Sequence, residues 1–424
     1  MKLTPLWTDL TPRPADLPAH DQPEEVDVAI IGSGYTGLHA ARVVADAGAK
    51  VAVLEREHIG FGASSRNGGM LTSGLKASPE IIEKRYGLDK ARQFWQWSLD
   101  SIDLVDRVIR DEGIDCGWAR RGHLSLAYKP AHFDHFRKHV DYLKNKYGYT
   151  GYTLVSRADL KNEIGTQEYY GGKTAETTGG LDPARYVFGL ARAVAKRGVS
   201  LVENAGVTRI RREDGAFRLT TPRGETRARE VLLATNGYTT PDVAPKARSG
   251  IMPIGSYIIS TEPLPEALQK ELSPNGRMFY DSKQYLNYFR LSPDGRMVFG
   301  GRNNLSTSLD LEESARRLHQ RMLTVYPQLE GVSLTHSWTG KLGVTYDLMP
   351  HIGRENGMWF AYGYGGHGVS IASFLGYEMG RILTGQQSGS LFQEIPHPRF
   401  FFTRWDKLFL PIVAQYYRLV DALT

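Results

Sequence analysis

The segment Gly32-Ser33-Gly34-Tyr35-Thr36-Gly37 has the glycine spacing of a dinucleotide-binding turn. It follows a continuous apolar run, residues 26–31, which is typical of a strand buried on both faces. In such a turn Gly32 permits the tight bend, Gly34 lets a pyrophosphate approach, and Gly37 lets the following helix pack closely on the strand. The helix N-terminus would supply N–H groups and partial positive charge to the phosphates. The sequence therefore predicts a dinucleotide site, with a purely structural glycine turn as the alternative.

An acidic residue follows this turn at the distance that such a site needs. Residues 51–54 form a second apolar run, and Glu55 closes it about eighteen positions beyond Gly37. A carboxylate at this place would accept hydrogen bonds from an adenosine ribose. The strand–helix–strand unit is complete, but by itself it does not distinguish NAD from FAD.

Two further glycine turns favour a cofactor with a second, larger head. "LLATNGYTT" (232–240) is an apolar run that enters a glycine turn, and "YGYGGHGVSIASFLG" (362–376) is a turn that opens a helix. A plain NAD domain needs neither, whereas an isoalloxazine ring must also be held. The helix N-terminus at Gly366-His367-Gly368 could face the flavin C2 carbonyl, where negative charge gathers on reduction.

The segment "GFGASSRNGGM" (60–70) is rich in small residues and has no helical or strand periodicity. A backbone with few side chains is typical of close approach to a ligand. We expect this segment to run along an extended cofactor, with Ser64, Arg66 and Asn67 as the polar contacts that remain.

Six motifs, spread in order over nearly the whole chain, carry a family resemblance: "IGSGYTGL", "GFGASSRNGG", "ATNGYT", "YFRLSPDGRMVFGGR", "SWTGKLGVTYDLMPHIGR" and "YGYGGHGV". The chain resembles the FAD-dependent D-amino-acid oxidase and sarcosine oxidase superfamily, and within it most of all the gamma-glutamylputrescine oxidoreductases. The resemblance implies an FAD cofactor and oxidation of a C–N bond to an imine, which water hydrolyses. A small-molecule amine is then the substrate, and O2 or another electron acceptor reoxidises the flavin.

The resemblance also assigns cofactor contacts to residues of this chain. The pyrophosphate would lie against Gly32, Ser33, Gly34, Thr36 and Gly37, and the adenosine end against Glu55, Arg56 and Val207. The ribityl chain and flavin would lie beside Ser64, Arg66, Asn67, Gly68, Gly69 and Met70. The remaining contacts would come from Ala234, Thr235, Asn236, Gly343, Gly366, His367, Gly368 and Val369.

The chain departs from the covalent sarcosine oxidases at several positions. It has no cysteine in residues 340–346, where those enzymes link the flavin, so we expect noncovalent FAD. Ser370 stands where they place a substrate-binding lysine, and Val298 where they place an oxygen-activating lysine; Lys341 is a candidate substitute for the second. Enzymes acting on gamma-glutamyl polyamines tend to have His-x-Pro where this chain has Leu181-Asp182-Pro183. The exact amine and the electron acceptor therefore stay open.

Amine oxidation by a flavin depends on placing the neutral amine with its α C–H facing flavin N5, so that a hydride equivalent can move. We therefore look for positioning residues and not for a nucleophile. Tyr288 and Arg290 alternate on one expected strand and share a face. Together with Arg302 and His367 they are the candidate catalytic residues. The alternatives are sheet packing for the tyrosine, surface charge for the arginines and a scaffold role for the histidine.

The elements that must position these residues predict an α/β fold. We expect a Rossmann-like FAD-binding domain of the glutathione-reductase type and a second, mostly antiparallel-sheet substrate domain. The first would comprise residues 25–112, 165–245 and 335–390, and the second 113–164 and 246–334. An extended arm, 1–24, pinned by Trp7, and a helical tail, 391–424, would complete the chain.

Three local patterns within these ranges predict particular elements. Four runs between 199 and 237 look like short strands of an added sheet. Residues 287–302 predict a hairpin that turns at Pro293-Asp294-Gly295, and residues 309–329 predict one amphipathic helix.

The composition is that of an ordinary globular protein and excludes several classes. The single cysteine, Cys116, cannot form an intrachain disulfide, and with the spacing of the twelve histidines it argues against a metal site. The net charge of +6 is not gathered in a Lys/Arg stripe, so we expect no nucleic-acid partner. No run of about eighteen apolar residues predicts a membrane span. We expect a cytoplasmic enzyme whose oligomeric state stays open.

Two alternative functions remain beside the amine oxidoreductase. A D-amino-acid dehydrogenase or an N-methyl amino acid oxidase would use the same cofactor on a substrate with an α-carboxylate. A flavoprotein subunit without a substrate site of its own is the alternative from another class.

Overall fold

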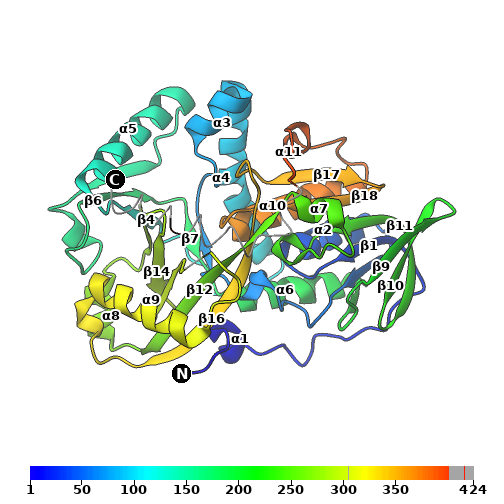
Figure 1. Ribbon diagram of the computed structural model, residues 1–424, viewed down its shortest axis with the longest axis horizontal. Helices are drawn as coiled ribbons and strands as arrows, with labels where there is room; N and C mark the ends of the chain where they lie inside the picture. Colours follow the sequence, from blue (N-terminus) through cyan, green and yellow to red (C-terminus); the bar gives the residue numbers. More distant parts are fainter. Residues whose placement is uncertain (304, 401–414, 416–424) are drawn as a thin grey trace.

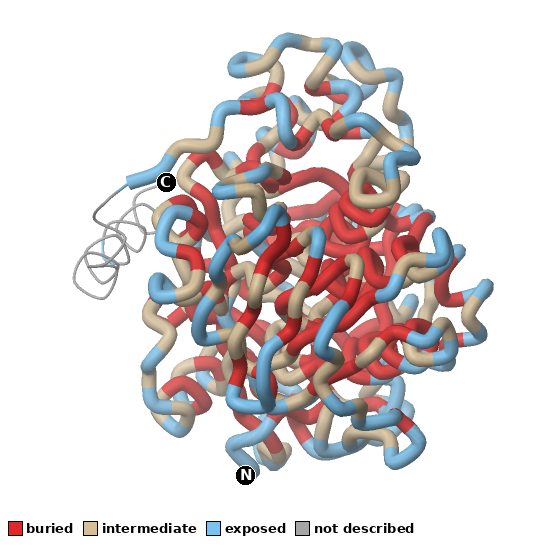
Figure 2. Tube along the Cα trace, turned by 90° about the vertical axis from the view of Figure 1, so that its right-hand side faces the viewer, coloured by how far each residue is buried: buried red, intermediate tan, exposed pale blue. Residues whose placement is uncertain are grey.

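The computed structural model describes residues 1–303, 305–400 and 415. Two large sheets dominate the described chain, the first on the right of Figure 1 and the second on the left. Figure 2 shows that the buried residues gather between and within these sheets, with exposed residues on the connecting turns. The expected α/β architecture, with a second sheet that is mostly antiparallel, is confirmed.

The first sheet has a parallel centre formed by the apolar runs of the sequence. Its path is β17-β18-β11-β1-β2-β8, and β10 and β9 extend from β11. β1 lies between β11 and β2 and pairs with both in parallel. The strands are β1 (Glu25–Ile31), β2 (Val51–Leu54), β8 (Ser200–Val202), β9 (Arg209–Glu213), β10 (Ala216–Thr221), β11 (Gly224–Leu233), β17 (His351–Glu355) and β18 (Met358–Tyr362).

The prediction of an added sheet between residues 199 and 237 is wrong for two of its four strands. β8 pairs in parallel with β2, and β11 pairs in parallel with β1, so both belong to the first sheet. Their apolar ends are buried as in any central parallel strand. β9 and β10 do form an antiparallel extension, in which β10 pairs with both β9 and the first part of β11.

Helices cover one face of the first sheet, and the antiparallel extension helps to cover the other. Val28, Ile30 and Val53 share a core with α2 (Tyr35–Asp46), α4 (Leu88–Asp111), α6 (Pro183–Ala195) and α10 (Gly368–Leu383). Ala29, Ile31 and other residues of the opposite face pack with β10 and with α7 (Pro245–Ser249). The parallel centre is thus buried on both sides, as the unbroken apolar runs predict.

The second sheet has the order β16-β12-β15-β14-β13-β4-β6-β5, and its pairs are antiparallel except β13 with β4. The hairpin of β14 and β15 turns at Pro293-Asp294-Gly295, as predicted. The strands are β4 (His123–Leu126), β5 (Tyr152–Ser156), β6 (Gly171–Ala175), β12 (Met252–Pro263), β13 (Met278–Asp281), β14 (Asn287–Leu291), β15 (Arg296–Gly301) and β16 (Leu334–Val344).

The strands β6 and β16 extend the second sheet beyond its predicted ranges. The sequence placed residues 165–245 and 335–390 wholly in the cofactor domain, yet β6 and β16 belong to the second sheet. Both are long-range partners of strands distant in the chain, a relation that local patterns do not encode.

The helix α9 (Leu311–Val325) packs its apolar face on the second sheet. Asp310 caps it by accepting hydrogen bonds from the backbone N–H groups of Glu312 and Glu313. The single helix predicted for 309–329 ends earlier, because Pro327 cannot continue it and opens the 3-10 turn η4 (Pro327–Leu329).

The remaining elements connect the two sheets or lie at the periphery. They are α1 (Leu6–Leu10), α3 (Pro79–Tyr86), α5 (Pro130–Tyr147), α8 (Glu266–Leu272), α11 (Leu391–Glu394), β3 (Met70–Leu71), β7 (Gly179–Gly180), η1 (Ala63–Ser65), η2 (Leu160–Asn162) and η3 (Asn236–Tyr238). The predicted tail, 391–424, begins with α11, and its residues 401–414 and 416–424 lie outside the described chain. No helix among the described residues is long and apolar enough to cross a membrane.

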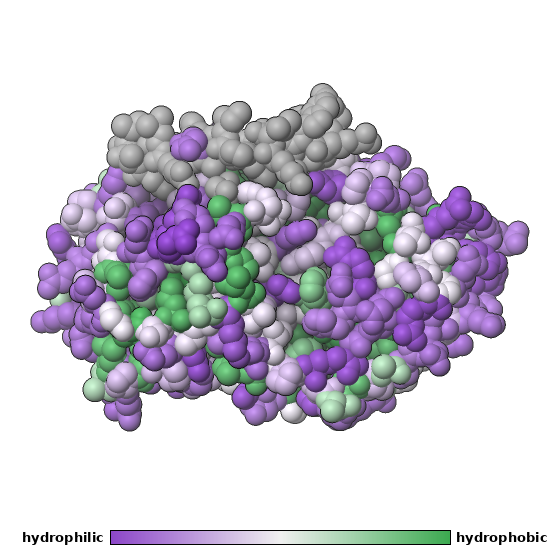
Figure 3. All heavy atoms as spheres, turned by 60° about the horizontal axis from the view of Figure 1, so that its bottom comes forward, coloured by the Kyte–Doolittle hydropathy of each residue, from purple (hydrophilic) through white to green (hydrophobic). Residues whose placement is uncertain are grey.

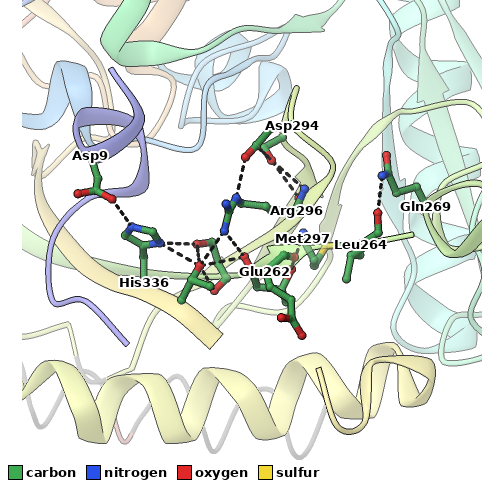
Figure 4. Close-up of polar contacts among 12 residues, drawn as sticks. Asp9, Glu262, Leu264, Gln269, Asp294, Arg296, Met297 and His336 are labelled. Carbon is green, nitrogen blue, oxygen red and sulfur yellow. Dashed lines mark hydrogen bonds and ion pairs between the residues drawn. The ribbon is translucent and has the colours of Figure 1, made fainter. Parts of the chain in front are cut away.

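The N-terminal arm is fastened to the second sheet through α1. His336 on β16 lies 3.1 Å from Asp9 (Figure 4). Lys2 makes an ion pair with the same carboxylate. The bonds from Lys2 and His336 hold the pKa of Asp9 below its ordinary value. Trp7 is buried, as its predicted pinning role requires. The face of the molecule in Figure 3 is otherwise mainly polar, with apolar side chains in separate patches.

Candidate active site

A cavity of about 660 Å3 is lined by residues of both sheets. Most of the predicted cofactor residues lie on its wall. They are Gly32, Ser33, Gly34, Thr36, Glu55, Arg56, Ser64, Arg66, Asn67, Gly68, Met70, Val207, Ala234, Thr235, Asn236, Gly343, Gly366, His367, Gly368 and Val369. Of the candidate catalytic residues, Tyr288, Arg302 and His367 line the same cavity.

The turn between β1 and α2 forms one end of the cavity. Gly32 has φ +103°, and a side chain there would press on the carbonyl of Ala234. A Cβ on Gly37 would collide with the carbonyl oxygen of Gly32, so this glycine lets α2 cross close to the turn. Gly37 itself does not line the cavity; its place is behind the turn, where the sequence predicted close packing.

Glu55 is tied to the same turn. Its Oε2 accepts hydrogen bonds from the backbone N–H and the hydroxyl of Ser33, at 2.9 and 2.7 Å. Its Oε1 accepts from the backbone N–H of Glu57 at 3.1 Å. Oε1 retains a further lone pair, and the residue lines the cavity, so a ribose hydroxyl could still donate to it.

The carbonyl oxygens of residues 66–69 are held from behind by four separate parts of the fold. The donors come from β16, α1, β14 and the connection between β7 and α6. The bonds run from Trp338 Nε1 to Arg66 (2.9 Å), Trp7 Nε1 to Asn67 (2.9 Å), Arg290 Nε to Gly68 (2.8 Å) and Leu181 N to Gly69 (2.9 Å). This segment is therefore a fixed wall of the cavity although it has almost no regular secondary structure.

The polar side chains of residues 60–70 make more hydrogen bonds within this segment than the sequence suggested. Asn67 donates to the carbonyls of Ala63 and Ser64, both at 3.1 Å, and accepts from the N–H of Gly69 at 2.7 Å. Arg66 donates to the carbonyl of Phe61 at 2.7 Å. Both residues still line the cavity, but these contacts shape the loop before any ligand is present.

Arg290 does not line the cavity, so the structure gives no support to the prediction that it positions a substrate. It is 6% exposed and donates to the carbonyls of Gly68 and Leu181, at 2.8 and 2.5 Å. Burial lowers its pKa to about 10, so it remains charged at neutral pH. Gly69, another predicted contact, also lies off the wall because its backbone faces Leu181 and this guanidinium. Arg290 thus braces the wall from the second sheet.

Two helix N-termini open onto the cavity. Neither α2, capped at Gly34, nor α10, capped at His367, has a side-chain cap or an acidic residue in its first turn. Their first N–H groups and partial positive charge are left for a ligand. With the bare glycine turn and the length of the lined wall, these two ends fit the pyrophosphate and the flavin ring of FAD.

Lys76 is a cavity residue that the sequence did not single out. It lines the wall beside the glycine turn of α10, and Gly365 packs against its side chain. Burial, and then the charge of Arg302, lower its pKa to about 8. Among the described residues it has no hydrogen-bond or ion-pair partner. Lys76 and Arg302 thus bring two cationic groups to one end of the cavity.

His367 lies beside this cationic end. Burial, and then the charge of Lys76, lower its pKa to about 4, so the imidazole is neutral near pH 7. Its Nδ1 is buried and has no hydrogen-bond partner within the described chain. The ring can therefore offer a neutral donor or acceptor to a ligand, but it cannot supply a positive charge.

The second sheet contributes an aromatic wall. Tyr288 on β14 lies directly opposite Tyr280 on β13, and both line the cavity. The hydroxyl of Tyr288 lies 2.9 Å from that of Ser256 on β12, and burial raises its pKa to about 12. Tyr280 and Ser256 were missed from the sequence because only the sheet order β12-β15-β14-β13 brings them to the same cavity. The two-residue alternation of β13 and β14 was the available signal.

The structure gives no support to the other reactive groups. Cys116 is 1% exposed and burial raises its pKa to about 12, as expected for a packed, unreactive thiol. Ser370 and Val298 are buried and do not line the cavity, whereas Lys341 does. No group of three or more metal-ligating side chains exists among the described residues.

The fold and this cavity define a flavin-dependent oxidoreductase.

Comparisons with known proteins also indicate a flavin-dependent oxidoreductase. Residues 27–382 match the family model of FAD dependent oxidoreductases. The chain is 34% identical to the probable oxidoreductase OrdL of Haemophilus influenzae, over 95% of this chain and 94% of that protein. It is 32% identical to the gamma-glutamylputrescine oxidoreductase of Escherichia coli, over 94% and 93%. A glycine oxidase from Geobacillus kaustophilus has the same fold, with a TM-score of 0.75 and 20% identity over 89% of this chain and 99% of that one.

The chain therefore belongs to the FAD dependent oxidoreductase family, and it is an FAD-binding enzyme. The superfamily resemblance read from the six motifs is confirmed.

Proposed function

We propose that this enzyme oxidises the C–N bond of a secondary or gamma-glutamylated amine to an imine, which water hydrolyses to an aldehyde and an amine. The observation that carries the proposal is one cavity that joins the bare glycine turns, with the cationic Lys76 beside one of them, to the aromatic wall of the second sheet. The identity to the gamma-glutamylputrescine oxidoreductase of Escherichia coli supports this substrate class.

The cofactor would be held noncovalently by the two helix N-termini and the wall of residues 60–70. When bound, FAD accepts a hydride equivalent from the carbon next to the amine nitrogen. The residues of the chain bind and orient the amine and keep bulk water from it. No covalent attachment is expected, since Cys116 is buried and does not line the cavity.

Lys76 and Arg302 select for a substrate that carries a carboxylate. Two cations at one end of a partly closed cavity repel each other, and Arg302 contributes to the lowered pKa of Lys76. A carboxylate placed between them would relieve this repulsion and accept charge-assisted hydrogen bonds. A gamma-glutamyl amine has such a group, whereas a free polyamine does not.

A carboxylated amino acid is the second candidate substrate, because the same two cations would bind its α-carboxylate. D-amino-acid dehydrogenase or N-methyl amino acid oxidase activity would follow. A flavoprotein subunit without its own substrate is disfavoured by the polar, aromatic wall that the second sheet builds opposite the cofactor end.

The test is an anaerobic screen in which the flavin absorbance of the purified holoenzyme is followed after mixing with candidate substrates. The panel contains gamma-glutamylputrescine, free putrescine, N-methylglycine and several D-amino acids. We expect the carboxylated amines to bleach the flavin and free putrescine to do so much more slowly. A holoenzyme that no amine reduces would overturn the proposed function.

A further inference from the structure

Tyr280 lines the cavity, and the direction of its hydroxyl is set by buried hydrogen-bonding groups behind it. It lies on β13, directly opposite Ser125 of β4. His123, two residues before Ser125, shares that face, and its ring lies against the ring of Tyr280 with centroids 5.1 Å apart. The hydroxyl of Tyr280 lies 3.2 Å from His123 Nε2.

The hydrogen bonds from Tyr280 through His123 and Thr178 end at the backbone carbonyl of Ala175, and this last acceptor sets the direction of each of them. The carbonyl oxygen of Ala175 can only accept, and the hydroxyl of Thr178 donates to it at 2.7 Å. The Thr178 oxygen, 3.0 Å from His123 Nδ1, must then accept, so Nδ1 carries the proton. If the ring is neutral, Nε2 has no proton and accepts one from the hydroxyl of Tyr280.

The ring of His123 is neutral. It is wholly buried, and burial, and then the charge of Lys173, lower its pKa to about 3. The chain therefore runs in one direction, from Tyr280 through His123 and Thr178 to the backbone. The proton of Tyr280 is committed to His123, and its oxygen, which Ser125 also contacts, can face a ligand only as an acceptor.

We propose that Tyr280 is a substrate-binding residue whose oxygen accepts a hydrogen bond from the N–H group of the amine, with His123 and Thr178 as positioning residues. A phenol that can rotate would offer a donor or an acceptor equally, whereas this one offers an acceptor. An acceptor suits an amine before oxidation and suits it better afterwards, because the nitrogen gains positive charge as the C–N bond is oxidised. Tyr280 therefore selects a nitrogen that carries a proton.

This inference rests on the proposed function, and its test uses the holoenzyme. The probe is gamma-glutamylputrescine, or whichever amine of the screen reduces the flavin faster. Anaerobic stopped-flow gives the Kd and the limiting rate constant of flavin reduction for the wild type and for Tyr280→Phe. Loss of a hydrogen bond to a charged or partly charged group weakens binding by about tenfold or more. We expect Kd to rise and the rate constant to fall by about that factor each.

A second readout does not depend on turnover. The dithionite-reduced holoenzyme binds the same amine without oxidising it, and anaerobic calorimetry gives the Kd directly. The matched control is Tyr169→Phe, which removes a buried hydroxyl without a hydrogen-bond partner from the core of the second sheet. This control should bind the amine like the wild type.

The positioning role of His123 has its own pair of variants. His123→Leu removes the acceptor behind Tyr280 and should reproduce the loss of binding. His123→Gln places an amide oxygen near the former Nε2 and should restore most of the affinity, which a merely structural role would not predict.

The outcomes separate the two claims. If wild-type holoenzyme is reduced by an amine but Tyr280→Phe binds that amine as tightly as the wild type, the role of Tyr280 is overturned and the proposed function stands. If no amine reduces the wild type, the proposed function fails and this inference fails with it. Equal loss in Tyr169→Phe would also overturn the inference, because the effect would then come from general destabilisation.

Discussion

The glycine-turn end of the cavity, where we propose that the cofactor binds, and the wall provided by the second sheet expose different parts of the protein. The cofactor end uses backbone groups: two uncapped helix N-termini and a bare segment whose carbonyls are fixed from behind. The wall of the second sheet uses side chains from separate strands, among them Tyr280 and Tyr288. Backbone recognition constrains many neighbouring residues at once, whereas each side chain of the wall can change by itself. A substitution at the glycine-turn end should therefore affect several neighbouring contacts, whereas a substitution in the wall of the second sheet should affect only its own contact.

The largest effect is expected from Gly37→Ala, at the cofactor end. The new Cβ would collide with the carbonyl of Gly32, and a backbone carbonyl cannot move aside cheaply. We expect the purified variant to contain little or no FAD, measured as the flavin-to-protein ratio. Gly389→Ala, where a Cβ meets only the flexible end of Gln393, is the control and should remain yellow. Full flavin content in both variants would contradict the claim that the close backbone packing at Gly37 is needed for FAD binding.

The second prediction tests whether Arg290 stabilises the cavity segment around Gly68 without contacting the ligand. Arg290→Met leaves the carbonyls of Gly68 and Leu181 without their donor. Two buried acceptors that lose their partners should lower the free energy of unfolding by about 3 kcal/mol, measured by urea denaturation. Flavin affinity should fall as well, although no atom of Arg290 lines the cavity. A variant that is stable but binds amine poorly would instead return Arg290 to the substrate site.

The third effect belongs to the substrate wall and depends on pH. The pKa of Lys76 is lowered to about 8, so its charge, and the attraction for a carboxylate, are present below pH 8 and are lost as pH rises through that value. A carboxylate that lacks an amine, such as glutarate, should bind up to about tenfold more weakly at pH 9.5 than at pH 7. Lys76→Met should bind it weakly at both pH values, with flavin content unchanged. A pH profile that survives in the variant would assign the titration to another group.

The smallest effect is expected at Trp7 and Trp338, the two tryptophans that donate to the carbonyls of residues 66 and 67. Trp7→Phe and Trp338→Phe each keep a ring but remove one N–H, which donates to the carbonyls of Asn67 and Arg66. Each loss should cost about 1 kcal/mol of stability, measured by urea denaturation. If neither variant differs from the wild type, water satisfies these carbonyls and the wall is less fixed than the contacts indicate.

Local sequence patterns predicted the cofactor end well because that end is made of local backbone geometry. The strand, turn and helix around Gly32 to Gly37 lie within one short stretch, and the turns at 232–240 and 362–376 were also visible as patterns. The side-chain partners of these turns were not. Asn67 was expected to touch the ligand, but it mainly holds its own loop, because hydrogen bonds inside a turn depend on its three-dimensional path.

The second sheet shows why the remaining assignments failed. Arg290 and Tyr288 share a strand, and the alternation rule put both on one face, yet Tyr288 lines the cavity and Arg290 does not. Position along the strand decides this difference, since the cavity ends before Arg290. Lys76 and Tyr280 were not singled out, because the strand pairing and loop path that bring them to the cavity join residues distant in the chain.

The sequence by itself determined the class of cofactor, the parallel centre of the first sheet and the flavoenzyme family, because glycine spacing and apolar periodicity report directly on backbone geometry. The tertiary structure alone decided which side chains meet at the substrate end. It also decided that four distant elements fix the carbonyls of residues 66–69, and that His123 and Thr178 orient Tyr280. These contacts join residues that are far apart in the chain, and only the pairing of strands and the packing of helices brings them within hydrogen-bonding distance.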